Sequence, residues 1–384
     1  MSESHGTAVL IACKDGEGTI GNTVRSAVGQ ADVYVVSDGS TDQTCAVAEA
    51  MGAHVLESGT SQGKPAALRA CNEHFKLTAR YRHIAVLDDD TTIEPCYIAQ
   101  LEGTMNADRR IAAASGRVDS IWDHTRRWNP LIAMRAFTYW SYQITVKRGQ
   151  NALRVVNVIC GANSLFRADV FARLIRDDVP YAVDDMYWTA EIIRRRLGRV
   201  AYVHEARSWT IDPHRFRDWY KQTVRWSWAQ FQSIRGHRLG RPLERTRGRL
   251  PGVRFSWVDF AYLALLLDWV PYMLEPLIVP PLAYLLRDWI NPLWFAVFYF
   301  ASTLGWIVIA AIALRKPRLI VLAPALIVLD LVYRACMLHA FVKTVVTPTI
   351  ERCTWVSPTR FALEPAPPAA VQQVLKPTQQ GERS

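Results

Sequence analysis

Short apolar runs alternate with longer amphipathic stretches from Thr7 to about Tyr202. The runs are rich in Val, Ile, Leu and Ala, which is typical of strands buried in a sheet, and the stretches between them are long enough to form helices. Strand-like runs stand at residues 8–12, 33–36, 55–56 and 83–87, with helical stretches near residues 19–29, 41–51 and 64–77. This order predicts an α/β domain with a largely parallel sheet and right-handed crossovers.

The pattern changes after Trp226, where arginines punctuate a stretch with few apolar residues. They are Arg235, Arg238, Arg241, Arg245, Arg247, Arg249 and Arg254. Anionic lipid attracts each such residue by about 1 kcal/mol, and apolar segments follow directly. We therefore expect a basic juxtamembrane collar at residues 235–256, with a plain solvated linker as the alternative.

Three apolar segments follow, at residues 257–286, 293–314 and 319–341. The second carries no charge and is long enough to cross about 30 Å of hydrocarbon. The first and third contain prolines and ionisable residues, so we expect them to be kinked, partly interfacial or lining a polar path. The expected parts are an α/β domain at 1–234, the collar, membrane-spanning or interfacial helices at 257–345, and an interfacial segment with a disordered tail at 346–384.

The charge balance indicates an anionic partner. Lys and Arg number 45 against 35 Asp and Glu, a net charge of +10. An acidic membrane face, a phosphorylated substrate or nucleic acid would satisfy this excess, and the apolar segments favour membrane lipid over nucleic acid. No basic region followed by a long apolar stretch opens the chain, so we expect a multi-pass protein of the cell membrane with its α/β domain in the cytoplasm.

A candidate metal site lies where the strand-like run at 83–87 ends. Asp88 and Asp90 are two positions apart in extended chain, so both lean to the same side and can hold Mg²⁺ or Mn²⁺, with phosphates completing the coordination shell. No basic residue adjoins them in the sequence, so we expect the metal to be obligatory. A second acidic cluster at residues 37–40 also follows a strand, and we expect both clusters to face one crevice.

Several motifs occur in a fixed order between residues 7 and 230. They are residues 35–42 around Asp38, Gly63-Lys64, Asp88-x-Asp90, residues 160–164 around Gly161, Asp184-Asp185 and Gln222-x-x-Arg225-Trp226. In this order they resemble family-2 glycosyltransferases, and the last is the signature of membrane-bound processive synthases of hyaluronan, chitin or cellulose. The resemblance implies a nucleotide-diphospho-sugar transferase (GT-A, Rossmann-like) domain, a UDP-sugar donor and Mg²⁺ or Mn²⁺.

The resemblance also assigns a role to each motif. Catalysis falls to Asp185 as base, with Asp184 beside it, and the metal to Asp88 and Asp90. The donor nucleotide is assigned to Asp38, Lys64, Asp88 and Arg225, and the acceptor to Gly161, Gln222 and Trp226.

The chemistry of glycosyl transfer supports these roles. A cation and basic groups must hold the charge that builds on the departing diphosphate, and a carboxylate must take the proton of the acceptor hydroxyl. The neighbouring negative charge of Asp184 raises the proton affinity of Asp185. One base acting opposite the leaving group implies inversion by direct displacement.

Simpler interpretations stand beside these roles. Asp38 could only close a turn, Asp184 and Asp185 could only serve a helix N-terminus, and Trp226 could pack in a core or at the membrane edge. For the whole chain we predict processive extension of a polysaccharide. The alternatives are single addition to a lipid or protein acceptor, and a non-enzymatic membrane sensor of sugar nucleotides.

A weaker resemblance concerns residues 355–360, which are similar to the gating loop of such synthases but carry extra residues. Three full membrane crossings would place this segment on the side opposite the α/β domain, where it could not gate. Either one apolar segment does not span the membrane, or the similarity is accidental.

Overall fold

The computed structural model describes residues 6–123, 126–236, 257–267, 269–287, 291 and 293–346. Residues 237–256 of the collar predicted at 235–256, the gating-loop resemblance at 355–360 and the C-terminal tail lie outside these residues. The α/β domain contains, in chain order, β1 (Thr7–Cys13), α1 (Ile20–Ala27), β2 (Asp32–Asp38), α2 (Thr44–Ala50), β3 (His54–Ser58), α3 (Lys64–Phe75), α4 (Leu77–Arg80), β4 (His83–Asp88), β5 (Thr91–Ile93), α5 (Tyr97–Ala107), β6 (Ile111–Ser120), α6 (Pro130–Tyr142), the π-helix η1 (Gln143–Lys147), α7 (Arg148–Ala152), β7 (Asn163–Arg167), α8 (Ala168–Leu174), α9 (Asp184–Arg194) and β8 (Arg199–Thr210).

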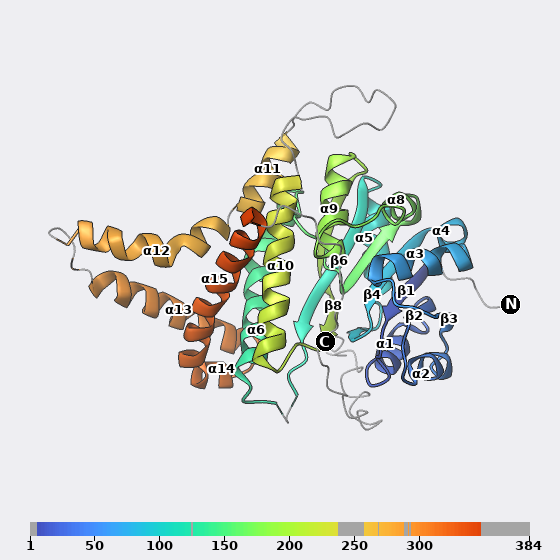
Figure 1. The fold of residues 1–384 in the computed structure, drawn as a ribbon, viewed down its shortest axis with the longest axis horizontal. Helices are drawn as coiled ribbons and strands as arrows, with labels where there is room; N and C mark the ends of the chain where they lie inside the picture. The colour runs from blue at the N-terminus through green and yellow to red at the C-terminus, as the bar shows by residue number, and fades with distance from the viewer. Residues whose placement is uncertain are drawn as a thin grey trace, which may run out of the picture.

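Eight strands form one twisted sheet in the order β3-β2-β1-β4-β7-β6-β8-β5 (Figure 1). Strands β1 to β4 pair in parallel, and so do β6 and β8, whereas β7 and β5 run antiparallel to their neighbours. The prediction of a largely parallel sheet is therefore confirmed. Both faces are covered, because alternate residues of β1 enter two separate cores: Val9 and Ile11 one, Ala8 and Leu10 the other.

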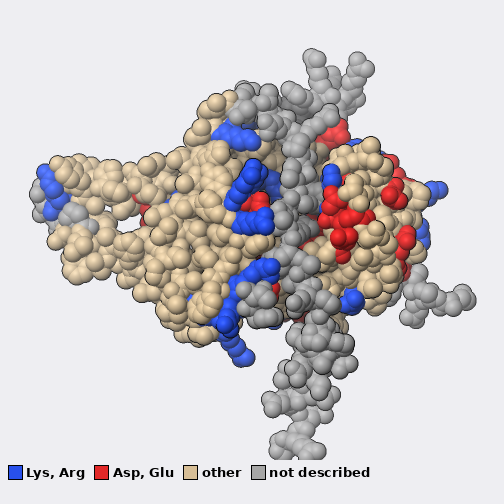
Figure 2. All heavy atoms as spheres, turned by 60° about the horizontal axis from the view of Figure 1, so that its bottom comes forward, with Lys and Arg blue, Asp and Glu red and all other residues tan. Residues whose placement is uncertain are grey.

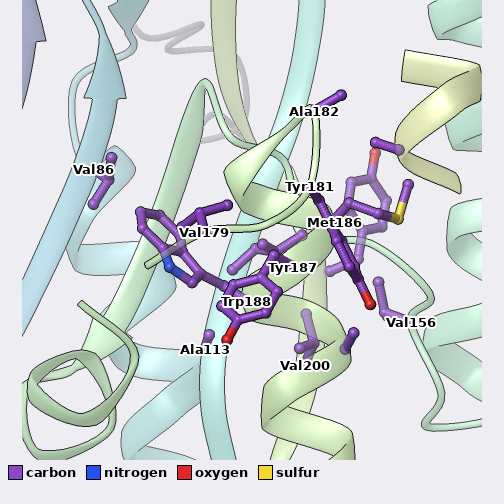
Figure 3. Packing of buried hydrophobic residues seen from close by; sticks show 14 of the residues in the cluster. Val86, Ala113, Val156, Val179, Tyr181, Ala182, Met186, Tyr187, Trp188 and Val200 are labelled. Atoms are coloured by element: carbon purple, nitrogen blue, oxygen red, sulfur yellow. The ribbon is translucent and has the colours of Figure 1, made fainter. Parts of the chain in front are cut away.

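Helix α9 is fixed by a buried tryptophan. Trp188 is 1% exposed and packs edge-on against Phe166 and Phe171, with ring centroids 5.7 and 5.9 Å away. Figure 3 shows it among apolar side chains from the sheet and neighbouring loops. Because Trp188 stands one helical turn after Asp184 and Asp185, its burial sets where the first turn of α9 lies.

A helical region follows the sheet domain. It consists of α10 (Phe216–Gly236), α11 (Trp257–Leu267), α12 (Trp269–Leu285), α13 (Leu293–Ala313), α14 (Arg318–Val321) and α15 (Ala323–Val346). Helix α15 packs along α10 and also touches α6, while α12 and α13 project away from the sheet domain as two arms (Figure 1).

Three helices of this region are long and apolar enough to cross a membrane: Trp257–Leu285, Leu293–Ala313 and Ala323–Val346. The first consists of α11 and α12, and α12 contains Pro276, Pro280 and Pro281. On the face shown in Figure 2 the two arms are mostly uncharged, with basic side chains at their far end. The prediction of a helical region after the α/β domain is confirmed, and α15 differs from the arms in packing along the domain.

Candidate active site

A cavity of about 190 Å³ lies beyond the carboxyl end of β4. Every site residue predicted from the sequence lines it except Asp38: Lys64, Asp88, Asp90, Gly161, Asp184, Asp185, Gln222, Arg225 and Trp226. The fold thus brings residues from more than half of the length of the α/β domain into one crevice. Sheets of this kind bind their ligands in such a crevice, beyond the carboxyl ends of the strands.

Asp38 ends β2 and is fully buried behind the cavity. Its carboxylate accepts hydrogen bonds from the amides of Gln62 and Gly63, at 2.8 and 2.9 Å, and from the hydroxyl of Ser61 at 2.9 Å. These contacts hold the loop that leads into α3, so Asp38 positions Lys64 through the backbone. Direct contact with the donor nucleotide stays a prediction.

Lys64 is the counter-ion of two aspartates. Its ammonium lies 2.6 Å from Asp88 Oδ1 and 3.7 Å from Asp184 Oδ2, and donates to the carbonyl of Gly161 at 3.3 Å. Burial lowers the pKa of Lys64, but Asp184 and Asp88 outweigh it and hold the pKa well above its ordinary value. The sequence analysis assigned Lys64 to the donor nucleotide but did not predict its ion pair with Asp88, because 24 positions separate the two residues.

The carboxylates at the end of β4 fit an open metal site. Asp88 and Asp90 both line the cavity, and the hydroxyl of Thr210 donates to Asp90 Oδ1 at 3.1 Å. Asp89 between them is fully buried and its Oδ2 accepts from Cys13 Sγ at 3.2 Å. Strand β4 ends at Asp88, so the turn from Asp89 to Asp90, rather than the expected extended chain, brings Asp88 and Asp90 to the same cavity. Among the described residues no three His, Cys, Asp or Glu side chains gather as a metal cage, so a cation here would need phosphate or water oxygens as well.

Asp185 lies in the first turn of α9 with both carboxylate oxygens held by amides. Gly161 N–H donates to Oδ2 at 3.0 Å and Met186 N–H to Oδ1 at 2.6 Å. Burial, followed by the negative charge of Asp184, raises the pKa of Asp185 to about 7, although Lys64 and the two amides oppose this. A side chain at Gly161 would place its Cβ 2.8 Å from Asp185 Oδ2, so only glycine allows this approach.

We expect kcat/KM to fall as the pH drops below about 7, because Asp185 must be deprotonated to act as a base and its raised pKa protonates it below that value. A pH profile with saturating metal measures this. Asp184→Asn should move the acid limb to lower pH, since it removes the like charge. A profile that stays flat from well below to well above pH 7 would contradict the assignment.

The sequence analysis missed Arg135, which organises the acceptor motif from helix α6. Its Nη2 donates to Thr223 Oγ1 at 2.8 Å and to Gln222 Oε1 at 3.0 Å, and its guanidinium lies over the rings of Trp226 and Trp219, 4.5 and 5.1 Å from their centroids. The side chain is 1% exposed. The sequence offers one local indication of this role, which is that Arg135 is the single charged residue of an otherwise largely apolar helix.

Asp212 is a second residue that the sequence analysis missed. It lines the cavity two positions after β8 ends, and accepts a hydrogen bond from the hydroxyl of Tyr139 at 2.8 Å. Arg135 Nε lies 3.9 Å from the same carboxylate. Burial raises the pKa of Asp212, and Arg135 opposes this rise. Arg225, in contrast, makes no hydrogen bond through its buried Nε within the described part of the chain.

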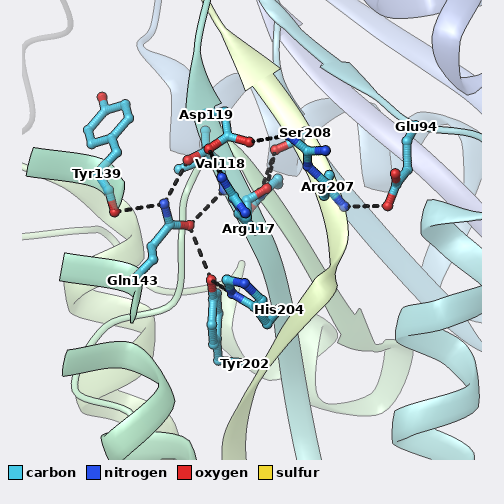
Figure 4. Close-up of polar contacts among 11 residues, drawn as sticks. Glu94, Arg117, Val118, Asp119, Tyr139, Gln143, Tyr202, His204, Arg207 and Ser208 are labelled. Atoms are coloured by element: carbon cyan, nitrogen blue, oxygen red, sulfur yellow. Dashed lines mark hydrogen bonds and ion pairs between the residues drawn. The ribbon is translucent and has the colours of Figure 1, made fainter. Parts of the chain in front are cut away.

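A larger cavity of about 670 Å³ adjoins the first. Both are lined by Tyr139, Cys160, Asp185 and Trp226, and the larger one extends to α12, α13 and α15. Gln143 braces its wall: the side-chain amide exchanges two hydrogen bonds with the backbone of Val118, at 2.7 and 2.8 Å, and donates to Tyr139 O at 2.9 Å (Figure 4). Because Asp185 lines both cavities, it lies in the wall between them.

The model of glycosyltransferase-like family 2 matches residues 5–229. The chain belongs to this family. This match confirms three predictions: the GT-A, Rossmann-like fold, the family resemblance and glycosyltransferase activity. The closer resemblance to the processive synthases stays a prediction.

One solved structure shares the fold over most of this chain, and another is similar to about half of it. The mannosyltransferase PcManGT from Pyrobaculum calidifontis, in complex with GDP-Man and Mn²⁺, covers 90% of this chain and 88% of its own, with 14% identity and a TM-score of 0.52. Glucosyl-3-phosphoglycerate synthase from Mycobacterium tuberculosis, in complex with Mg²⁺ and UDP, covers 53% of this chain and 70% of its own, with 17% identity and a TM-score of 0.35. No curated protein matches the chain.

Proposed function

We propose that this glycosyltransferase is a membrane-bound, inverting enzyme that transfers a sugar from a nucleotide diphosphate donor to an acceptor hydroxyl. One observation carries the proposal: Asp185, with a pKa raised to about 7, stands in the wall between a polar cavity lined by acidic and basic groups and a larger cavity beside it. The smaller cavity suits the donor, and the larger one the acceptor.

In this mechanism Asp185 takes the proton of the acceptor hydroxyl while that oxygen bonds to the anomeric carbon and the bond to the diphosphate breaks. Lys64 and Arg225 lie on the donor side and stabilise the departing charge. Arg135 positions Gln222 and Trp226 for the acceptor. Asp88 and Asp90 would hold Mg²⁺ or Mn²⁺, which supplies positive charge against the diphosphate when bound.

The donor proposed from the sequence is a UDP-sugar, and Asp38 supports the loop beside its expected nucleotide site. The test is release of nucleoside diphosphate by the purified full-length protein in detergent with Mn²⁺, across matched UDP- and GDP-sugars. We expect release from one class of donor. Tight binding of a sugar nucleotide without any release would favour the sensor instead.

Membrane attachment through α12, α13 and α15 is part of the proposal, with the α/β domain in the cytoplasm and the collar at the anionic leaflet. Large apolar side chains on the arms support it, among them Phe298 at 76% and Leu285 at 72% exposure. Ionisable groups inside these helices pair with one another: Arg334 lies 3.0 Å from Asp330 and also contacts Glu275. This pairing offsets part of the free energy that is needed to place charged side chains in the membrane.

A second candidate is processive extension of a polysaccharide. It is favoured by Trp226, whose ring lies in the wall of both cavities and is held from one side by Arg135. Stacking of a sugar on an aromatic face would retain a growing chain between additions.

Trp226→Ala should shorten or abolish the products while leaving nucleotide binding largely intact, because stacking of the ring on the acceptor sugar adds nothing to the binding of the donor phosphates. Product length by gel or mass analysis at low donor conversion measures this, with Trp128→Ala, an exposed tryptophan, as control. Single-sugar adducts alone from the unaltered protein under donor excess would refute polymerisation and favour single addition.

A further inference from the structure

The walls of the larger cavity are mostly apolar. Aromatic side chains are prominent among the lining residues, and Trp269, Trp306 and Tyr333 come from three different helices of the apolar region. Trp306 is held in place by a hydrogen bond from its Nε1 to Ser141 Oγ at 2.7 Å and packs against Trp140. A hydrated sugar polymer gains little from such walls, whereas a hydrocarbon chain is stabilised by each CH₂ group buried there.

Helix α13 has one side on the cavity and another that is exposed. Ser302 and Thr303 line the cavity, whereas Phe300 and Leu304 are exposed and, two positions from Ser302, lie on a different face of the helix. If α13 lies in the membrane as proposed, only this one helix separates this part of the cavity from lipid, so a molecule dissolved in the bilayer is close to it.

Among the described residues that line the cavity, Lys147 is a cation that makes no ion pair. Arg135 and Arg334 also line it, but each has a carboxylate within 3.9 Å or less. Lys147 is 5% exposed, donates to the carbonyl of Val158 and makes no ion pair with any described residue. Burial lowers the pKa of Lys147 to about 8, against the opposite effects of Cys160 and Asp185, so it is still mainly charged at neutral pH.

We propose that the cavity binds the acceptor and that the acceptor is an anionic lipid, with its hydrocarbon chain between α6, α13 and α15 and its negative group at Lys147. This inference rests on the proposed transferase function and specifies the acceptor of the same site. A hydroxyl on the lipid headgroup meets Asp185, which takes its proton as the oxygen bonds to the anomeric carbon. The nucleoside diphosphate leaves, and the product is a glycosylated lipid.

The test is photolabelling of the full-length protein in neutral maltoside micelles with dodecyl phosphate that carries a diazirine in its alkyl chain. Mass spectrometry should find the label on cavity-lining residues of η1 and α13, such as Val146 and Thr303. Unlabelled dodecyl phosphate should compete, while dodecanol should compete weakly and inorganic phosphate not at all. Competition by inorganic phosphate as strong as that by dodecyl phosphate would overturn the lipid assignment.

Two pairs of variants test separately how the hydrocarbon chain and the negative group of the probe are bound. Thr303→Trp fills the cavity and should lower labelling about tenfold, whereas Leu304→Trp on the outer surface of the same helix should not. Lys147→Met should raise the dodecyl phosphate concentration for half-competition by at least about tenfold, with Lys147→Arg close to the parent. Labelling unaffected by Thr303→Trp would show that the probe lies elsewhere and overturn the proposal.

Labelling requires no sugar nucleotide, so the two proposals can fail separately. Nucleotide release without any label in the cavity would overturn the lipid acceptor and leave the transferase standing. Labelling of the cavity in a protein that releases nucleotide from no donor would contradict the transferase and leave a lipid site without its proposed reaction.

Discussion

Asp185→Asn should lower sugar transfer by about two to four orders of magnitude, the usual contribution of a positioned general base. The amide retains the size of the carboxylate and can still accept from Gly161 N–H, so the loop before β7 should keep its place. It cannot take a proton from the acceptor. Steady-state turnover with the preferred donor measures the loss.

Nucleotide-sugar affinity should change little in this variant, because the carboxylate of Asp185 is bonded to the amides of Gly161 and Met186 and reaches the cavity proposed for the acceptor. Asp178→Asn is the matched control, since its carboxylate is 90% exposed and lies outside both cavities. Turnover by Asp185→Asn at near the parent rate would move the base to Asp184 or Asp212, the other carboxylates without a metal role that line the donor cavity.

Chelation with EDTA should silence the enzyme, and added Mn²⁺ should restore it. Asp90→Asn should lower transfer by about two to three orders of magnitude, as for loss of one group that stabilises transition-state charge, and should also weaken nucleotide binding. The physical reason is that Asp90 lines the cavity beside Asp88, so the substitution removes a carboxylate oxygen that a cation bound to the diphosphate would use as a ligand. Turnover assays and nucleotide titrations measure the two effects.

Full activity in excess EDTA would refute the requirement for metal and leave Lys64 and Arg225 as the groups that hold the diphosphate. Melting temperature is the necessary control for Asp90→Asn, because the side chain is 6% exposed and bonded to Thr210. A variant that melts like the parent, binds nucleotide like the parent and transfers normally would remove Asp90 from the site.

The sequence by itself determined the order of the elements and the edge of the sheet where chemistry occurs. Both follow from local periodicity: alternating residues of an extended strand point to opposite faces, and helices repeat every 3.6 residues. The sequence also predicted that Asp88 and Asp90 face one space, although the turn after β4, and not extended chain, places them there. The apolar helices were equally readable, because length and hydropathy are properties of the segment alone.

Only the tertiary structure decided which distant groups meet. Lys64 reaches Asp88, and Arg135 reaches Gln222, 87 positions away, because packing of α3 and α6 on the sheet places them there. The raised pKa of Asp185 and the lowered pKa of Lys147 depend on burial, which is a property of the whole fold. The cavity between η1 and α13 exists only because helices far apart in the chain close around it, so the sequence left the class of acceptor open.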